Sequence, residues 1–317
     1  MLIHTKCPID GTDDLDEELY PASFDLEHVT PEVFSARRMP DRMHYRMVRN
    51  KRTGCVRADP ILDLETILAL YQQSRVNQQD VAPYTLKTYE KYLERVLPLL
   101  PDKRGALEIG CATGLFLEQL FTRGFSVVKG IELSADAVEK APMQVRPHIL
   151  QQPLTPGLFT PESFSLVCGF QVLDHLIQPN EILTASWEIL APGGIMYWIC
   201  HDIGSPVARL LGERCPIIDI EHVVLYDKRT LAKLFSRNNF DVLHVFGVSN
   251  AYPLSYWLHL APVPKKEWFL PFLNATGLGR WQMNANLGNM CIIARKNVQI
   301  AATKVATNGT AEEQMSK

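Results

Sequence analysis

The chain has 317 residues, of which 46% are hydrophobic and 21% charged, an ordinary globular composition that leaves room for a sizeable core. Its formal net charge of −3 excludes a general electrostatic attraction to nucleic acid or to an anionic membrane. Seven scattered cysteines, and no uncharged apolar run near the ~20 residues of a membrane span, predict a soluble, cytoplasmic protein with reduced thiols.

The first 62 residues contain two loops with the spacing of zinc-ribbon knuckles. A structural zinc ion needs four Cys or His ligands, normally from two C-x-x-C pairs. Cys7 stands at one ligand position, but Asp10, Asn50 and Thr53 occupy the other three. We therefore predict a degenerate zinc-ribbon-like segment over residues 1–62 and no bound metal.

Basic residues are frequent between positions 34 and 57. One interpretation is a solvated face that balances the acidic run Asp13–Glu18. The other is a clamp for an anionic small molecule, because the forked side chains of residues such as Arg38 and Arg42 suit oxyanions. The sequence leaves both interpretations open.

Two helices are predicted over residues 63–100. Apolar residues recur at helical spacing in two runs, which a polar stretch rich in Gln and Asn separates. The runs are Leu64, Ile67, Leu68 and Tyr71, then Tyr89, Tyr92, Leu93, Val96 and Leu97.

A strand, a tight turn and a helix follow. A short apolar run contains Glu108, small residues then recur at Gly110, Ala112 and Gly114, and an amphipathic helix begins at Leu115. Glycine allows positive φ and the close approach of a ligand. An acid at the strand end suits a ligand that carries an amine better than it suits a pyrophosphate. The dinucleotide pattern G-x-G-x-x-G would also need a small residue in place of Leu115.

The chain then alternates strand and helix, which predicts a parallel sheet with helices on both faces. The second strand, residues 125–132, ends in Glu132, whose carboxylate can accept both ribose hydroxyls of an adenosine ligand. A weaker third strand covers about residues 146–151.

A second informative block covers residues 163–176, where an apolar strand ends in Gln171 and is followed by Asp174 and His175. A helix from Glu181 to Leu190 then stops at a Pro-Gly-Gly sequence, and an apolar strand follows over residues 195–200.

These three blocks, in this order over about residues 105–200, resemble those of class I S-adenosylmethionine (SAM)-dependent methyltransferases. The acid-x-Gly-x-Gly-x-Gly loop has Ala112 at the middle glycine position, and Leu173–Leu176 matches the leucine-acid-histidine-leucine segment. The resemblance implies a set of SAM-binding residues, with Leu133 packed on the adenine, Gln152 near its amino group and Gln171 near the methionine end. The set is Glu108, Gly110, Ala112, Gly114, Glu132, Leu133, Gln152 and Gln171.

The resemblance also implies the architecture: an α/β, Rossmann-like, doubly wound and mostly parallel seven-stranded sheet with an antiparallel edge strand. An N-terminal cap and a C-terminal insertion would be added to it. Residues 63–100 would form a helical lid over the cofactor, with Tyr84 and Tyr89 facing the acceptor. Residues 101–297 would form the SAM-binding domain, with an acceptor-side insertion at about residues 203–285. The composition of residues 298–317 predicts a disordered tail.

Three histidines are candidates for a catalytic base: His175, His201 and His222. Imidazole has the pKa best suited to proton removal near neutral pH. A lone histidine is more often a structural residue with satisfied hydrogen bonds than a base, and the sequence does not choose among the three.

The function predicted from the resemblance is in-line methyl transfer from SAM to a small molecule in biosynthesis, such as the hydroxyl of a sugar, natural product or lipid. The acceptor would be anionic or apolar, and the aromatic segments 251–260 and 268–273 allow a lid or a homodimer contact. Nucleic acid is not expected as a substrate, because no Asn-Pro-Pro-aromatic motif follows the fourth strand. The alternatives are an NAD-dependent oxidoreductase and a non-catalytic SAM-binding scaffold.

Overall fold

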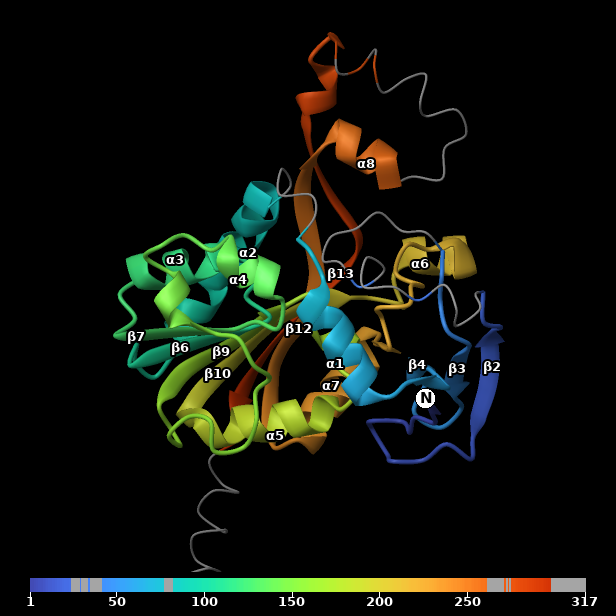
Figure 1. The fold of residues 1–317 in the computed structure, drawn as a ribbon, viewed down its shortest axis with the longest axis horizontal. Helices are drawn as coiled ribbons and strands as arrows, with labels where there is room; N and C mark the ends of the chain where they lie inside the picture. The colour runs from blue at the N-terminus through green and yellow to red at the C-terminus, as the bar shows by residue number, and fades with distance from the viewer. Residues whose placement is uncertain are drawn as a thin grey trace, which may run out of the picture.

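A computed structural model describes residues 1–23, 29, 34, 42–76, 82–260, 271, 273 and 275–297 (Figure 1). The predicted disordered tail therefore lies outside the described residues, as does most of the segment 268–273. Within the described ranges, no helix is long and apolar enough to cross a membrane.

The centre of the fold is a seven-stranded sheet in the order β12-β13-β10-β9-β6-β7-β8. Five neighbouring strands run parallel, β13 runs antiparallel to β10, and β12 at the edge runs antiparallel to β13. This confirms the expected mostly parallel, doubly wound sheet with antiparallel pairing at one edge. The strands are β6 Gly105–Ile109, β7 Val127–Ile131, β8 Ile149–Leu150, β9 Phe164–Phe170, β10 Leu190–His201, β12 Phe240–Pro253 and β13 Gln282–Lys296.

Helices cover both faces of this sheet, and the alternation of strand side chains separates two cores. In β6, Ala106 belongs to one buried cluster with residues of α2 and α3, whereas Leu107 belongs to the other, with residues of α5 and α7. Successive strand residues point to opposite faces, so a strand that is apolar throughout is buried on both. The helices are α2 Ala82–Val96, α3 Leu115–Thr122, α4 Ala135–Glu139, α5 Pro179–Ile189 and α7 Lys228–Arg237.

The N-terminal residues form small sheets that join the larger core. One has the order β11-β4-β3-β2, and β1 pairs with β5. Because β11 comes from the insertion after β10, the N-terminal segment is tied to the rest of the chain by strand pairing. The strands are β1 Leu2–Ile3, β2 Asp16–Tyr20, β3 Met47–Asn50, β4 Val56–Ala58, β5 Ile61–Leu62 and β11 Val224–Leu225.

The two loops predicted as degenerate knuckles lie next to each other. The Cys7 Sγ atom lies 3.3 Å from the Thr53 hydroxyl, and the Asn50 side-chain oxygen accepts hydrogen bonds from the Thr53 amide at 2.9 Å and from its hydroxyl at 3.2 Å. At three of the positions that correspond to zinc ligands, the side chains of Cys7, Asn50 and Thr53 thus contact one another. The relationship of the segment to a zinc ribbon stays a prediction.

A buried ion pair fixes the N-terminal sheet. The guanidinium of Arg57, whose side chain is fully buried, donates to both carboxylate oxygens of Asp16 and to the backbone oxygen of Thr5. Removal of one member of a buried pair leaves an uncompensated charge. The Asp16–Arg57 pair should therefore matter far more for stability than the surface ion pairs of the same sheet.

We expect Asp16→Ala to lower the free energy of unfolding by about 3 kcal/mol or more, because Arg57 then stays buried without its partner. Glu17→Ala is the matched control: Glu17 is exposed on the same strand and lies 3.6 Å from Lys51. Its loss should cost less than about 1 kcal/mol. Urea denaturation of both variants measures the difference, and equal losses would contradict it.

The remaining helices are short or lie outside the layers that cover the sheet. They are α1 Leu64–Gln73, α6 Pro206–Leu211 and α8 Leu254–Leu260, with short 3-10 helices at η4 Leu97–Leu99, η5 Arg146–His148, η6 Leu173–His175, η7 Gly212–Arg214 and η8 Leu278–Arg280. Strands β12 and β13 continue as a two-stranded arm beyond the sheet, and α8 lies along this arm (Figure 1). Strand β13 is therefore longer than the apolar run at its end, 290–295, indicates.

Candidate active site

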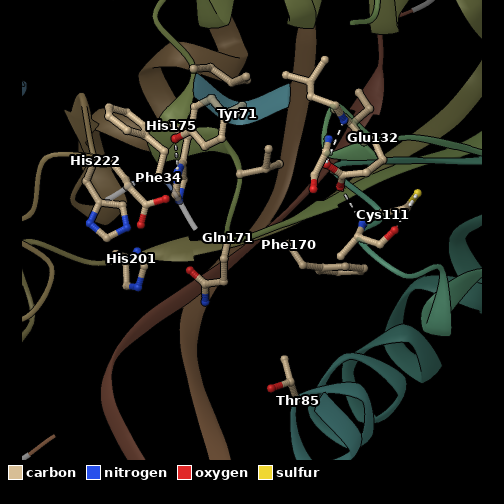
Figure 2. A pocket seen from close by; sticks show the side chains of 18 of the residues that line it. Phe34, Tyr71, Thr85, Cys111, Glu132, Phe170, Gln171, His175, His201 and His222 are labelled. Atoms are coloured by element: carbon tan, nitrogen blue, oxygen red, sulfur yellow. Dashed lines mark hydrogen bonds between the residues drawn. The ribbon is translucent and has the colours of Figure 1, made fainter. Parts of the chain in front are cut away.

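A large cavity lies at the carboxyl ends of the parallel strands. Its volume is about 850 Å³, near the upper end of the ~300–1,000 Å³ that is usual for small-molecule sites. Residues of α1, α2, the loops after β6, β7 and β9, α6 and the arm all line it. The predicted helical lid, the predicted cofactor loop and the predicted insertion thus contribute to one continuous space (Figure 2).

The loop after β6 has the backbone conformation that its small residues suggest. Gly110 has φ of 70°, and a Cβ atom there would lie 3.0 Å from the Val172 side chain. Ala112 also takes a positive φ, 47°, which L-residues other than glycine rarely adopt. The amides of Gly110 and Cys111 both donate to the Ile131 carbonyl, which fixes the loop against the end of β7. Gly114 caps α3 with φ of 74° but does not line the cavity.

Glu132 holds three backbone amides at the end of β7. Its carboxylate accepts hydrogen bonds at 2.8 Å each from the amides of Ala112, Leu133 and Ser134. Burial raises the pKa of Glu132, against the effect of these three donors. A carboxylate offers about four lone-pair directions, so capacity for a further donor from a ligand remains.

The other predicted cofactor residues differ in their positions. Glu108 is buried and lines the cavity, and Leu133 lines it beside Glu132. Gln152 is exposed and does not line the cavity, whereas Leu154 does. The contact of Gln152 with an adenine amino group therefore stays a prediction.

Gln171 lies in the middle of the cavity, between the cofactor loop and the histidines (Figure 2). Its backbone has φ of 55°, and its amide donates to the Ile199 carbonyl at 2.7 Å. Its side-chain oxygen is buried and has no hydrogen-bond partner among the described residues. Because a buried acceptor is costly to leave unpaired, this oxygen is a binding group for a ligand donor.

Asp174 and His201 form a hydrogen-bonded pair. Asp174, on η6 after β9, is fully buried, and its carboxylate accepts a short hydrogen bond from Nδ1 of His201 at the end of β10. Burial would raise the pKa of Asp174, but the neighbouring imidazoles, His201 first, hold it well below its usual range. Asp174 is therefore an anion, and it fixes the ring proton of His201 on Nδ1. The Nε2 atom of His201 is left with a lone pair, and His201 lines the cavity.

His175 is held from the other side by the lid helix α1. Nδ1 of His175 lies 2.8 Å from the hydroxyl of Tyr71, whose pKa burial raises well above its usual range. Tyr71 therefore keeps its phenolic proton, and Nε2, the other ring nitrogen of His175, lies 3.9 Å from the Asp174 carboxylate. With both ring nitrogens directed at protein groups, His175 orients its neighbours rather than a substrate.

His222, in the loop before β11, completes the group. Its Nδ1 lies 2.9 Å from the Ile217 carbonyl, so Nδ1 carries the proton and Nε2 the lone pair. Its ring centroid lies 4.6 Å from that of His201 and 4.8 Å from that of His175. Burial, and then the nearby His201, lower the pKa of His222. All three histidines singled out in the sequence therefore meet around Asp174.

Two residues that hold the histidines were not identified as site residues from the sequence: Tyr71, which lines the cavity, and Asp174, which does not. Tyr71 was noted only for its apolar spacing, and Asp174 only for its place in a motif. The remaining aromatic prediction is met in part: Tyr89 lines the cavity and stacks on Phe170 with centroids 4.0 Å apart, whereas Tyr84 does not line it. The sequence signal that could have pointed to Asp174 is its place directly before His175, just after an apolar strand.

Comparison with known proteins identifies the family. A family model described as a methyltransferase domain matches residues 82–245, a little over half of the chain. The matched range contains the cofactor loop, Glu132, the three histidines and α7.

Sequence relatives are similar over a shorter range. A ubiquinone biosynthesis O-methyltransferase of Caulobacter sp. (strain K31) is 32% identical over 98 residues, 28% of this chain and 38% of the relative. That of Roseobacter denitrificans is 30% identical over 128 residues, 37% of this chain and 47% of the relative. The chain thus spans less than half the length of these curated relatives. Among solved structures, a putative methyltransferase from Bacillus halodurans aligns with a TM-score of 0.48 and 16% identity, over 66% of this chain and 98% of its own.

Proposed function

We propose that this chain, which belongs to the class I SAM-dependent methyltransferase family, moves a methyl group from SAM to the hydroxyl of a small molecule, with His201 as the base. The observation that carries the proposal is that one cavity has two halves with different chemistry. In the first half, Glu132 binds the amide of Ala112 in the loop after β6. In the second half, the Asp174 carboxylate holds the imidazole of His201.

The residues of the first half fit SAM. Glu132 would accept one ribose hydroxyl, Glu108 would face the amino group of the methionine part, and the buried Gln171 oxygen offers a further acceptor. When bound, SAM supplies a sulfonium-activated methyl group. The chain's own task is then to hold the acceptor in line and exclude water, which can contribute ~7–11 kcal/mol to the lowering of the barrier.

The residues of the second half fit a hydroxyl acceptor. Asp174 holds His201 with its Nε2 lone pair available, and this nitrogen would accept the proton of the acceptor hydroxyl. Asp174 then stabilises the imidazolium that forms. The sequence relatives are named as O-methyltransferases, which supports oxygen as the methylated atom.

The cavity wall also bears on the charge of the acceptor. Among the described residues that line it, none is lysine or arginine, which favours an uncharged, largely apolar acceptor. Of the two arginines named for the anionic alternative, Arg38 lies outside the described residues, and Arg42 is exposed and does not line the cavity. A cytoplasmic location and a homodimer stay predictions.

Binding and turnover of the full chain test the proposal. SAM at 100 times its Kd should raise the free energy of unfolding by about 2.7 kcal/mol, and NADH should leave it unchanged. A panel of phenols, sugars and polyketide-like alcohols, incubated with methyl-labelled SAM, should yield a labelled methyl ether. Stabilisation by NADH alone would favour the oxidoreductase, and SAM binding without any labelled product would favour the scaffold.

A further inference from the structure

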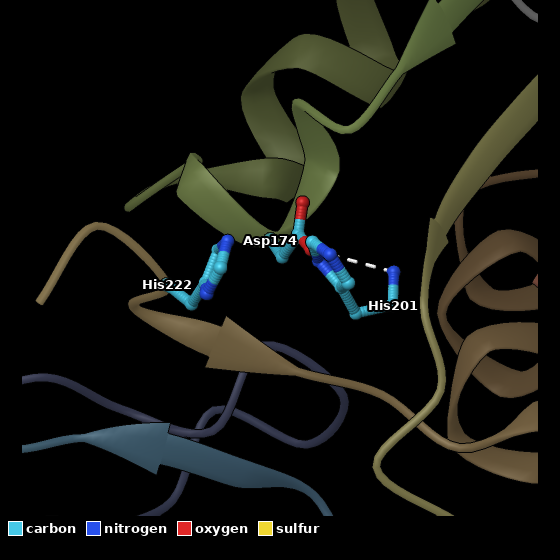
Figure 3. A group of neighbouring side chains, drawn as sticks. All are labelled: Asp174, His201 and His222. Carbon is cyan, nitrogen blue, oxygen red and sulfur yellow. Dashed lines mark hydrogen bonds and ion pairs between the residues drawn. The ribbon is translucent and has the colours of Figure 1, made fainter. Parts of the chain in front are cut away.

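Three metal-ligating side chains meet at the acceptor end of the cavity. Asp174, His201 and His222 each offer one ligand atom, and these atoms all lie within 4.8 Å of one another. Figure 3 shows Asp174 between the two imidazole rings. We propose that these three side chains bind a divalent transition-metal ion of the Zn²⁺ or Co²⁺ class, and that the bound ion blocks the base.

The donor set suits such an ion. Two imidazoles and one carboxylate are ligands for zinc and for other first-row metals, and they leave a coordination position open. His222 is already arranged as a ligand, because Nδ1 bonds to the Ile217 carbonyl and Nε2 keeps its lone pair. Metal-bound histidines usually have their second ring nitrogen anchored in this way.

The carboxylate is also in place. Asp174 is fully buried, so a cation beside its carboxylate meets ligand oxygens that solvent does not screen. The ion would enter between the Asp174 carboxylate and Nδ1 of His201, which now share a short hydrogen bond. That hydrogen bond is exchanged for two metal–ligand bonds, and the ring proton of His201 moves from Nδ1 to Nε2.

The required movement is small. Ligand bonds of about 2.0–2.2 Å put tetrahedral donors roughly 3.4 Å apart. The widest donor pair must therefore approach from at most 4.8 Å, which rotation of the imidazole rings can supply. His201 has room for this, because about 20% of its side chain is exposed toward the cavity.

The functional consequence rests on the proposed function. His201 can act as a base only while Nε2 has its lone pair, which requires the proton on Nδ1. A metal ion on Nδ1 places the proton on Nε2 and removes the base. We therefore expect metal binding to inhibit methyl transfer without displacing SAM.

The experiment needs a control for a second group that can bind a metal ion, the thiol of Cys7. A hydrogen bond from Cys55, despite the opposing effect of burial, lowers the pKa of the Cys7 thiol to about 6. A thiolate there is itself a soft metal ligand. Cobalt separates the two places, because thiolate ligation adds a sulfur-to-metal charge-transfer band in the near ultraviolet and imidazole ligation does not.

The test uses the full chain freed of metal by dialysis against a chelator. Co²⁺ should bind one ion per chain with visible bands of imidazole and carboxylate ligation and no thiolate band. His222→Gln and Asp174→Asn should each weaken binding about tenfold or more. His244→Gln, at an exposed histidine of β12, and Cys7→Ser should leave it unchanged. Circular dichroism and SAM binding confirm that each variant is folded.

Three results would overturn the metal site: no binding by the folded protein, binding that His222→Gln leaves intact, or a spectrum that Cys7→Ser abolishes. Methyl transfer measured with and without Zn²⁺ then tests separately whether His201 is the base. Inhibition that His222→Gln relieves supports both proposals. Stimulation by Zn²⁺ would keep the metal site and reject His201 as the base.

Discussion

Asp174→Asn should lower kcat for methyl transfer by about 10²–10⁴-fold, the contribution usual for a positioned acid–base group. An amide of the same shape can present its NH₂ group to Nδ1 of His201. The ring proton then moves to Nε2, the nitrogen that has to accept the acceptor proton. The variant also removes the anion that stabilises the imidazolium. The measurement is single-turnover methyl transfer to an acceptor found in the labelled-SAM screen.

The matched control for this variant is Asp202→Asn. Asp202 is also buried and follows His201 directly in the chain, but its carboxylate accepts a hydrogen bond from the Gly204 amide rather than from an imidazole. Its activity should remain close to that of the parent. SAM affinity should be unchanged in both variants, because neither residue lines the cavity. Equal losses of kcat in the two variants would show that Asp174 acts through the fold and not through His201.

The geometry of the loop that is proposed to bind the cofactor was predictable because the loop is local in the sequence. Glu108, Gly110 and Ala112 lie in one strand–turn–helix segment, whose pattern fixes both the backbone and the direction of the loop. Glu132 ends the neighbouring strand, and parallel strands place their carboxyl ends at the same edge of a sheet. The pattern does not indicate that Glu132 ties the loop of Ala112, which depends on the pairing of β6 with β7.

The acceptor half depends on contacts between distant parts of the chain. Tyr71 bonds to a histidine 104 positions later, and Asp174 bonds to one 27 positions later. Each of the three histidines is a plausible base on its own, so only their arrangement distinguishes them. The structure gives His175 two protein partners, gives His201 a carboxylate, and gives His222 a carbonyl. No sequence periodicity carries this information.

The N-terminal sheet shows the same limit in the fold. Strand β11 has only two residues, Val224 and Leu225, too few for an alternating pattern, yet it joins the insertion to β4. The outer part of β13 was missed for a related reason. There Ala285 pairs with Asn250 on the arm, away from the core, so the apolar signal of a buried strand is absent.

Glu132→Ala should weaken SAM binding about 100-fold or more. The loss removes the acceptor for one ribose hydroxyl and leaves three backbone amides without the carboxylate that holds them. A 100-fold change corresponds to about 2.8 kcal/mol, at 1.4 kcal/mol for each tenfold. Hydrogen bonds to charged groups contribute about 1.5–3 kcal/mol each, so loss of one ribose contact together with a looser loop accounts for the effect. Calorimetric titration with SAM gives the Kd directly.

Glu132→Gln separates the two parts of this effect. Its amide oxygen can still accept from the Leu133 and Ser134 amides, but its nitrogen cannot accept from the Ala112 amide. The loop is then no longer held, so binding should stay severely weakened even though the side-chain shape is kept. Glu118→Gln, on α3 after the same loop, is the control, since Glu118 bonds to Gln144 and does not line the cavity. If Glu132→Gln bound SAM as tightly as the Glu118 variant, the carboxylate would have no part in cofactor binding. The cofactor would then have to lie elsewhere in the cavity, out of line with His201.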